Sequence, residues 1–237
     1  MEVKDHRQRV AAERRERMRA RLLAGAMSRV AASGPGAMSI DEVIAEAGVS
    51  RGTFYKYFPS PDALLSELAV EIANGLIRMA EPVVLNRSDP AERVACGIRV
   101  VARLAIAHPL AASCLARMGW PGAEGPHVLF DYVRRDLEEG IRQERFKPLP
   151  IALALNIVTG AVLGATRSML EPDCVADFAE QTAAAAMRAL GVDARTAERI
   201  AYKPIDAIEI AAPGLLAETL PPPSVGTIKK SGPRRQV

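Results

Sequence analysis

Apolar residues recur at intervals of three and four along most of the chain, and this spacing constrains the fold more than any other feature. Such intervals place side chains on one face of an α-helix, whereas a half-buried strand needs alternation at two. The two clearest stripes consist of Met18, Leu22, Leu23, Ala26, Met27 and Val30, and of Leu65, Leu68, Ile72, Leu76 and Met79. No convincing strand pattern and no repeat at a solenoid period is present. The sequence therefore predicts an all-α fold.

Glycine, proline and capping residues divide this helical chain. Residues 33–37 (SGPGA) end the first helix, Ser39 can cap a short helix that runs to Gly48, and Ser50 can cap the next one. Ser60-Pro61-Asp62 begins a longer helix with a hydroxyl cap, a proline at the first position and a carboxylate at the positive dipole end. Further helices are expected over residues 90–107, 110–118, 126–143, 151–170 and 175–190, with a short one after Asp193.

The positive charge of the chain is unevenly distributed. Residues 1–29 hold nine lysines and arginines against four acidic residues, whereas residues 61–200 hold fifteen against eighteen. This asymmetry indicates a polyanion partner for the N-terminal end alone. A solvated helix face with internal salt bridges would explain the charge equally well.

Residues 49–58, VSRGTFYKYF, gather aromatic and basic side chains in a chain that is only 4% aromatic. The two short helices around Gly48 are typical of a helix-turn-helix, in which the second helix enters the major groove. At about 100° per residue, Phe54 and Phe58 share the inward face. The residues expected on or beside the outward face are Arg51, Gly52, Thr53, Tyr55, Lys56 and Tyr57.

The outward residues have side chains that suit duplex DNA. An arginine such as Arg51 can pair with guanine O6 and N7, and the Thr53 methyl can meet a thymine methyl. Lysine or tyrosine can reach phosphates or base edges, and Gly52 lets the backbone approach closely. Periodicity alone leaves one alternative open, an ordinary aromatic cluster on a surface helix.

Residues 39–58, SIDEVIAEAGVSRGTFYKYF, together with Ser60 and Asp62-Ala-Leu64, closely resemble the DNA-binding domain of TetR-family transcriptional regulators. The resemblance covers about the first quarter of the chain. It implies a helix-turn-helix domain over residues 1–60 and a helical ligand-binding and dimerisation domain over residues 61–202. Residues 203–237 hold six of the seventeen prolines and are expected to form a flexible tail.

The resemblance also implies which residues contact DNA. They are Ser39, Ser50, Arg51, Gly52, Thr53, Tyr55, Lys56 and Tyr57, with Arg19 and Arg21 as further contacts to the DNA backbone. Pro61 departs from the family pattern, which usually has a lysine there. The phosphate contact of that lysine would then fall to the free amides of the helix end or to the basic stretch Arg14, Arg15, Arg17, Arg19 and Arg21.

Residues 151–166, IALALNIVTGAVLGAT, are uncharged, and Gly160 and Gly164 place small residues four apart. Such spacing lets two helices approach closely. The flanking prolines and Arg167 leave too little apolar length for a membrane span, so we expect a buried helix. With the alanines at 183–186 it would form a face that pairs with a second copy. The resemblance implies a homodimer on a pseudo-palindromic operator, with half-sites about one helical turn apart.

A small-molecule ligand is implied by the resemblance and only faintly by the residues. Candidate pocket residues are Cys96, Met118, Trp120, Phe130 and Asn156. Plain core packing is the alternative for each, since methionine and cysteine are common core fillers.

Nothing in the sequence predicts an enzyme, a metal site or a cofactor. The three histidines are His6, His108 and His127. None lies in H-E-x-x-H, and there is no P-loop or G-x-G-x-x-G after a strand. Three widely spaced cysteines and a charged N-terminus predict a reduced, cytoplasmic protein. The remaining alternative is a helical architectural or interaction protein that binds nucleic acid without ligand control.

Overall fold

The structure is a computed structural model that describes residues 2–120, 128–205, 212 and 214–218. These residues contain helices and no β-strand, which confirms the all-α prediction. The elements are α1 (Glu2–Ser33), the 3-10 turn η1 (Pro35–Ala37), α2 (Ile40–Ala47), α3 (Arg51–Phe54), α4 (Pro61–Leu85), α5 (Pro90–Ala107), α6 (Pro109–Met118), α7 (Val128–Arg142), α8 (Ile151–Met169), α9 (Phe178–Ala189), α10 (Ala194–Ala201) and α11 (Gly214–Glu218).

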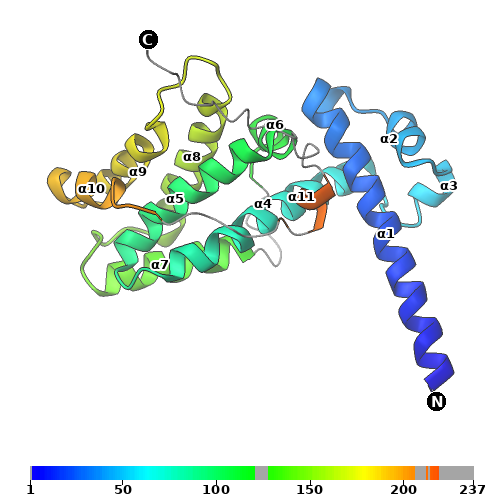
Figure 1. The fold of residues 1–237 in the computed structure, drawn as a ribbon, viewed down its shortest axis with the longest axis horizontal. Helices are drawn as coiled ribbons and strands as arrows, with labels where there is room; N and C mark the ends of the chain where they lie inside the picture. Colours follow the sequence, from blue (N-terminus) through cyan, green and yellow to red (C-terminus); the bar gives the residue numbers. More distant parts are fainter. Residues whose placement is uncertain (1, 121–127, 206–211, 213, 219–237) are drawn as a thin grey trace, which may run out of the picture.

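The helices form a small N-terminal group and a larger group, joined by α4 (Figure 1). The small group contains α1, α2 and α3, and the beginning of α1 extends away from both groups. Helix α1 starts at Glu2, well before the stripe that predicted it. Helix α9 starts at Phe178, slightly later than expected. The predicted helix start at residue 126 lies outside the described residues.

One core holds the small group together. Its buried side chains are Leu22, Leu23, Ala26, Met27, Val30, Val43, Ala47, Phe54, Phe58, Leu64 and Leu68. Burial of each large side chain contributes about 1.5–3 kcal/mol before the entropy of ordering is subtracted. Leu64 and Leu68 belong to α4, so the beginning of α4 is part of this small core.

The turn between α2 and α3 depends on a glycine and on hydroxyl caps. Gly48 has φ +63°, a left-handed conformation, and its N–H donates to the carbonyls of Ala45 and Ile44. A Cβ at this position would also lie 3.1 Å from Nη2 of Arg21. Both conditions favour glycine. Ser50 then caps α3 by accepting a hydrogen bond from the Thr53 amide, which fixes where the second helix begins.

Helix α5 is central to the larger group and packs against α4, α7, α8 and α9 (Figure 1). A buried ionic cluster fastens it to α9. Arg99 donates from Nε and Nη2 to Oε1 of Glu180, at 3.1 and 2.9 Å, and Arg103 pairs with the same oxygen. Because Arg99 and Glu180 are both buried, each depends on the other for charge compensation.

Several described residues of the segment that is expected to form a flexible tail contact the rest of the protein. The Lys203 carbonyl accepts a hydrogen bond from Arg99, and the Pro204 carbonyl accepts one from Arg87. Farther on, α11 buries Leu215 and Leu216, and it packs against α1 and α4. A five-residue helix in a proline-rich context has no periodicity long enough to be detected in the sequence.

Helix α8 is long and apolar enough to cross a membrane, and α5 and α6 pass the same test as a pair bent by 114°. One face of α8 lies in the protein core. Its buried residues are Ala154, Leu155, Val158, Val162, Ala165 and Thr166. The opposite face is exposed.

Candidate DNA-binding face and ligand cavity

Helix α3 is anchored by two phenylalanines. Phe54 and Phe58 are 0% and 1% exposed, and their ring centroids lie 5.9 Å apart. The helical turn continues past Phe54, because the amides of Tyr57 and Phe58 both donate to the Phe54 carbonyl. The inward face predicted from the sequence is therefore confirmed, and the short helix has a fixed orientation on the small core.

The opposite side of α3 is open. Arg51, Gly52, Tyr55 and Lys56 are exposed, and Thr53 is half-buried. A Cβ at Gly52 would meet only Oγ of Ser50, at 3.9 Å. No packing among the described residues requires glycine there, so the missing side chain leaves room for a surface that approaches from outside.

The predicted contacts Ser39 and Ser50 serve as helix caps in the free protein. The Ser39 hydroxyl accepts from the Glu42 amide at 3.2 Å, and the Glu42 carboxylate accepts from the Ser39 amide in return. Ser50 Oγ lies 3.1 Å from the Thr53 amide and 3.0 Å from the Thr53 hydroxyl. Both serines are exposed, so any phosphate contact would be added to a cap.

Arg19 and Arg21, which are expected to contact the DNA backbone, both have partners within the protein. Arg19 faces α4 and pairs with Glu67 and Glu71, while Arg21 donates to the Ala47 carbonyl at 2.5 Å and braces the turn before α3. Another arginine of the basic stretch lies beside α3: the Arg15 guanidinium is 5.8 Å from the centre of the Tyr57 ring. The helical sequence could not show which side of α1 would contact α4.

The start of α4 offers little to a phosphate. The Ser60 hydroxyl already accepts from the Ala63 amide at 3.1 Å, and Pro61 has no N–H. The carboxylate of Asp62 is exposed in the same turn and would repel an anion. The free amides at this helix end are therefore poorly suited to replace the phosphate contact of the missing lysine.

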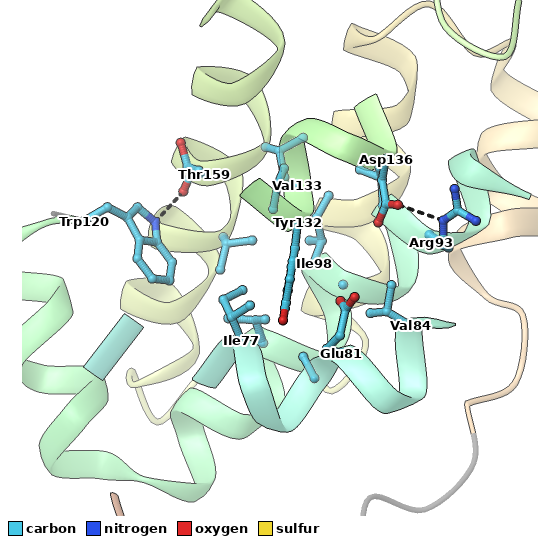
Figure 2. A pocket seen from close by; sticks show the side chains of 16 residues that line it. Ile77, Glu81, Val84, Arg93, Ile98, Trp120, Tyr132, Val133, Asp136 and Thr159 are labelled. Atoms are coloured by element: carbon cyan, nitrogen blue, oxygen red, sulfur yellow. Dashed lines mark hydrogen bonds and ion pairs between the residues drawn. The ribbon is translucent and has the colours of Figure 1, made fainter. Parts of the chain in front are cut away.

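A cavity of about 50 Å³ lies within the larger group (Figure 2). Its walls come from α4, α5, α7, α8 and Trp120. The apolar lining side chains are Ile77, Ala80, Val84, Val94, Ile98, Val101, Val133, Val158 and Val162. Figure 2 shows Tyr132 between the apolar residues around Ile77 and the polar residues on the other side. An apolar cavity with few polar groups is typical of a small-molecule site.

The polar end of the cavity is formed by Glu81, Arg93 and Asp136. Nε of Arg93 lies 2.8 Å from Oδ1 of Asp136. Arg135 joins the two carboxylates, since it donates to Asp136 at 2.9 Å and to Glu81 at 2.8 Å. The hydrogen bond to Asp136 is the main reason that the pKa of Arg135 is raised. Two carboxylates are thus held in fixed positions at one end of an otherwise apolar space.

Of the five predicted ligand residues, only Trp120 lines the cavity. Its indole N–H donates to the Thr159 carbonyl at 2.8 Å, and Figure 2 shows the ring at the apolar end. The remaining four are Cys96, which is buried elsewhere, Asn156, which is exposed, and Met118 and Phe130, which are half-buried. Within the described chain, no group of three or more His, Cys, Asp or Glu side chains could hold a metal ion.

Sequence reasoning missed Glu81, Tyr132 and Asp136. One indication of this polar group was available in the sequence of α7. Asp136 follows Tyr132 by four residues and therefore lies on the same face of the helix. A carboxylate on a buried helix face is unusual unless it has a partner. The partners come from α4 and α5, so only the folded chain reveals the group.

Two family profiles match the chain. The profile of "Bacterial regulatory proteins, tetR family" matches residues 22–68, which span the helix-turn-helix and the start of α4. The profile of "Tetracyclin repressor-like, C-terminal domain" matches residues 89–203, from the cap of α5 to the end of α10. No curated protein matches the chain significantly.

Solved structures resemble most of the chain. RolR, crystallised in complex with resorcinol, is 30% identical, and the match covers 83% of this chain and 99% of RolR with a TM-score of 0.60. A TetR-family transcription regulator from Shewanella sp. PV-4 is 20% identical over 74% of this chain and 99% of that one, with a TM-score of 0.63. FadR from Bacillus subtilis, in complex with stearoyl-CoA, is 19% identical over 73% and 97%, with a TM-score of 0.55. The latter two support the fold alone.

Proposed function

The chain belongs to the TetR family of bacterial regulatory proteins, and we propose that it is a homodimeric repressor released from a pseudo-palindromic operator by a small molecule. The observation that carries the proposal is the two-sided character of α3. Phe54 and Phe58 hold one side in the core, and Arg51, Gly52 and Lys56 lie open on the other. Its function would place the protein with the chromosome in the cytoplasm, and it requires no catalysis.

Base reading falls to the exposed side of α3. Arg51 can form a bidentate pair with a guanine, and Lys56 and Tyr55 can reach phosphates or base edges. Arg15 is placed beside Tyr57 and is the best-supported backbone contact from α1. Secondary contacts with DNA, at the edges of this face, are expected from Ser39, Ser50, Thr53 and Tyr57.

The exposed face of α8 supports assembly with a second copy. Leu153 is 47% exposed, and Asn156, Gly160 and Gly164 follow on the same side of the helix. A Cβ at Gly160 or Gly164 would meet no atom within 4 Å. Since packing within the subunit does not require these glycines, close contact with a partner helix explains them best. A dimer presents two copies of α3, and the avidity gives operator affinity that a single short helix lacks.

The cavity supports a small aromatic ligand with hydroxyl groups. RolR was crystallised with resorcinol, and here Tyr132 and Trp120 line the cavity while Glu81 and Asp136 can accept hydrogen bonds. The space of about 50 Å³ is smaller than the roughly 150 Å³ that holds a benzene ring elsewhere. The ligand must therefore displace the walls, which include α4. Because α4 also carries part of the small core, such a displacement would reposition α3.

Capture of genomic DNA fragments by the purified protein tests this proposal. We expect bound fragments to share an inverted repeat with half-sites about one helical turn apart, and to stay preferred over random DNA at physiological salt. Binding that weakens equally for all DNA as salt rises would instead indicate the architectural alternative. Trp120 is the single tryptophan and lines the cavity, so its fluorescence reports ligand binding directly. Resorcinol that neither changes this fluorescence nor releases DNA would contradict the ligand class.

A further inference from the structure

The described residues that follow α10 contact both parts of the molecule. Residues 203 and 204 make three contacts with residues of α5 or just before it. Nη1 of Arg99 donates to the Lys203 carbonyl at 2.7 Å, and Nη2 of Arg87 donates to the Pro204 carbonyl at 2.5 Å. The Lys203 ammonium lies 2.6 Å from the Glu92 carboxylate. These contacts hold Lys203 and Pro204 beside the N-terminal half of α5.

Helix α11 then lies on α4 beside α1 (Figure 1). Its leucines Leu215 and Leu216 are 4% and 1% exposed, although the helix has only five residues. Leu216 rests on the backbone of α4 at Gly75, where an added Cβ would lie 2.8 Å from Cδ1 of Leu216. A longer side chain at position 75 would occupy the space that the leucine fills.

A polar seam continues this contact between α1 and α4. Arg19 of α1 pairs with Glu67 and Glu71 of α4. A Cβ on Gly214 would lie 3.6 Å from Oε1 of Glu71, so the start of α11 reaches the same seam. Residues from α1, α4 and α11 therefore meet at one place, where the contacts are both charged and apolar.

We propose that α11 is a clasp that holds α1 against α4 and restrains the orientation of the DNA-binding helices relative to the larger domain. Helix α4 is shared by the small core and the cavity, so an element fastened to both α1 and α4 acts where ligand and DNA binding are coupled. Release of the clasp widens the range of orientations open to α3, and a dimer that is less pre-organised binds its operator less tightly.

Substitution of a buried leucine of α11 by aspartate tests the clasp. Leu216→Asp places a carboxylate at a 1% exposed position, whereas Ala217→Asp makes the same charge change at an exposed neighbour. Amide hydrogen exchange measures local opening. We expect exchange in residues 14–23 and 68–75 to be about tenfold faster in Leu216→Asp and unchanged in Ala217→Asp. A chain ended after residue 205 should behave as Leu216→Asp does, without a buried carboxylate.

Operator affinity provides the second measurement and depends on the proposed function. We expect Leu216→Asp and the shortened chain to bind operator at least about fivefold more weakly than Ala217→Asp. Hydrogen exchange decides the clasp even if no operator is found, so the two proposals fail separately. Equal exchange rates in all three variants would overturn the clasp. Faster exchange with unchanged operator affinity would overturn its role in orienting α3.

Discussion

Arg51 and Asp41 form an ion pair across the helix-turn-helix, with Nη2 of Arg51 at 2.9 and 3.0 Å from the two carboxylate oxygens of Asp41. Both side chains are more than half exposed. Exposed pairs of this kind contribute little stability, about 0–1 kcal/mol. In the protein without DNA, the pair therefore holds Arg51 over α2 only weakly. A base or a phosphate can replace Asp41 as the partner of Arg51 with little loss of free energy.

Removal of the Asp41 charge should raise affinity for all DNA and reduce discrimination. Asp41→Asn frees Arg51 and deletes a negative charge from the face that approaches phosphates. We expect about three- to tenfold tighter binding to random DNA, with a smaller gain on the operator. Fluorescence anisotropy with both duplexes measures the two affinities. Asp131→Asn, an exposed change in α7, is the control and should alter neither.

Substitutions of Arg15 and of Arg19 should distinguish a contact with DNA from a contact between α1 and α4. Arg15→Gln is expected to lower the salt dependence of DNA binding by about one charge per subunit, since Arg15 lies beside α3. Arg19→Gln should leave that dependence unchanged and weaken the contact of α1 with α4. Binding measured over a series of salt concentrations distinguishes them. A salt dependence lowered by Arg19→Gln alone would reverse the assignment.

The helix-turn-helix was largely predictable from sequence because its determinants are local. Caps at Ser39 and Ser50, the turn glycine and the spacing of two phenylalanines all act within twenty residues. The partners of Arg19 and the docking of Leu216 were not predictable. They depend on which faces of distant helices meet, and helical periodicity specifies a face without its neighbour. The residues that line the cavity were not predictable for the same reason, since they come from four helices.

His108 should make stability depend on pH near neutrality. It is buried between α5 and α6, and this burial lowers its pKa below the ordinary value of 6.5. Just below pH 6.5 the unfolded chain therefore binds more protons than the folded chain. The contribution of neutral His108 to the free energy of unfolding is fully present above pH 6.5 and decreases as the pH falls from 6.5 toward the lowered pKa of the folded state. Urea denaturation at about pH 7.5 and about pH 5.5 measures the difference. His108→Gln should lose less stability over this interval, and an equal loss would contradict the assignment.

The ionic cluster between α5 and α9 should be sensitive to loss of its single carboxylate. Glu180→Gln leaves the buried Arg99 without a counter-charge, which typically costs about 3–5 kcal/mol. Glu198→Gln is the matched control, because Glu198 is exposed and pairs with Arg188 only at 3.9 Å, and it should cost less than about 0.5 kcal/mol. Urea unfolding of both variants gives the two free energies. Similar values would mean that the buried pair contributes no more than the exposed one.

The most direct test of the account is the base preference of Arg51→Ala, measured on the operator and on all of its single-base variants. If α3 reads the major groove, the variant loses about 1–3 kcal/mol on the operator and loses discrimination at one base pair in each half-site, while the other positions keep theirs. A uniform loss of affinity, with discrimination intact at every position, would contradict a base-reading role for the exposed side of α3.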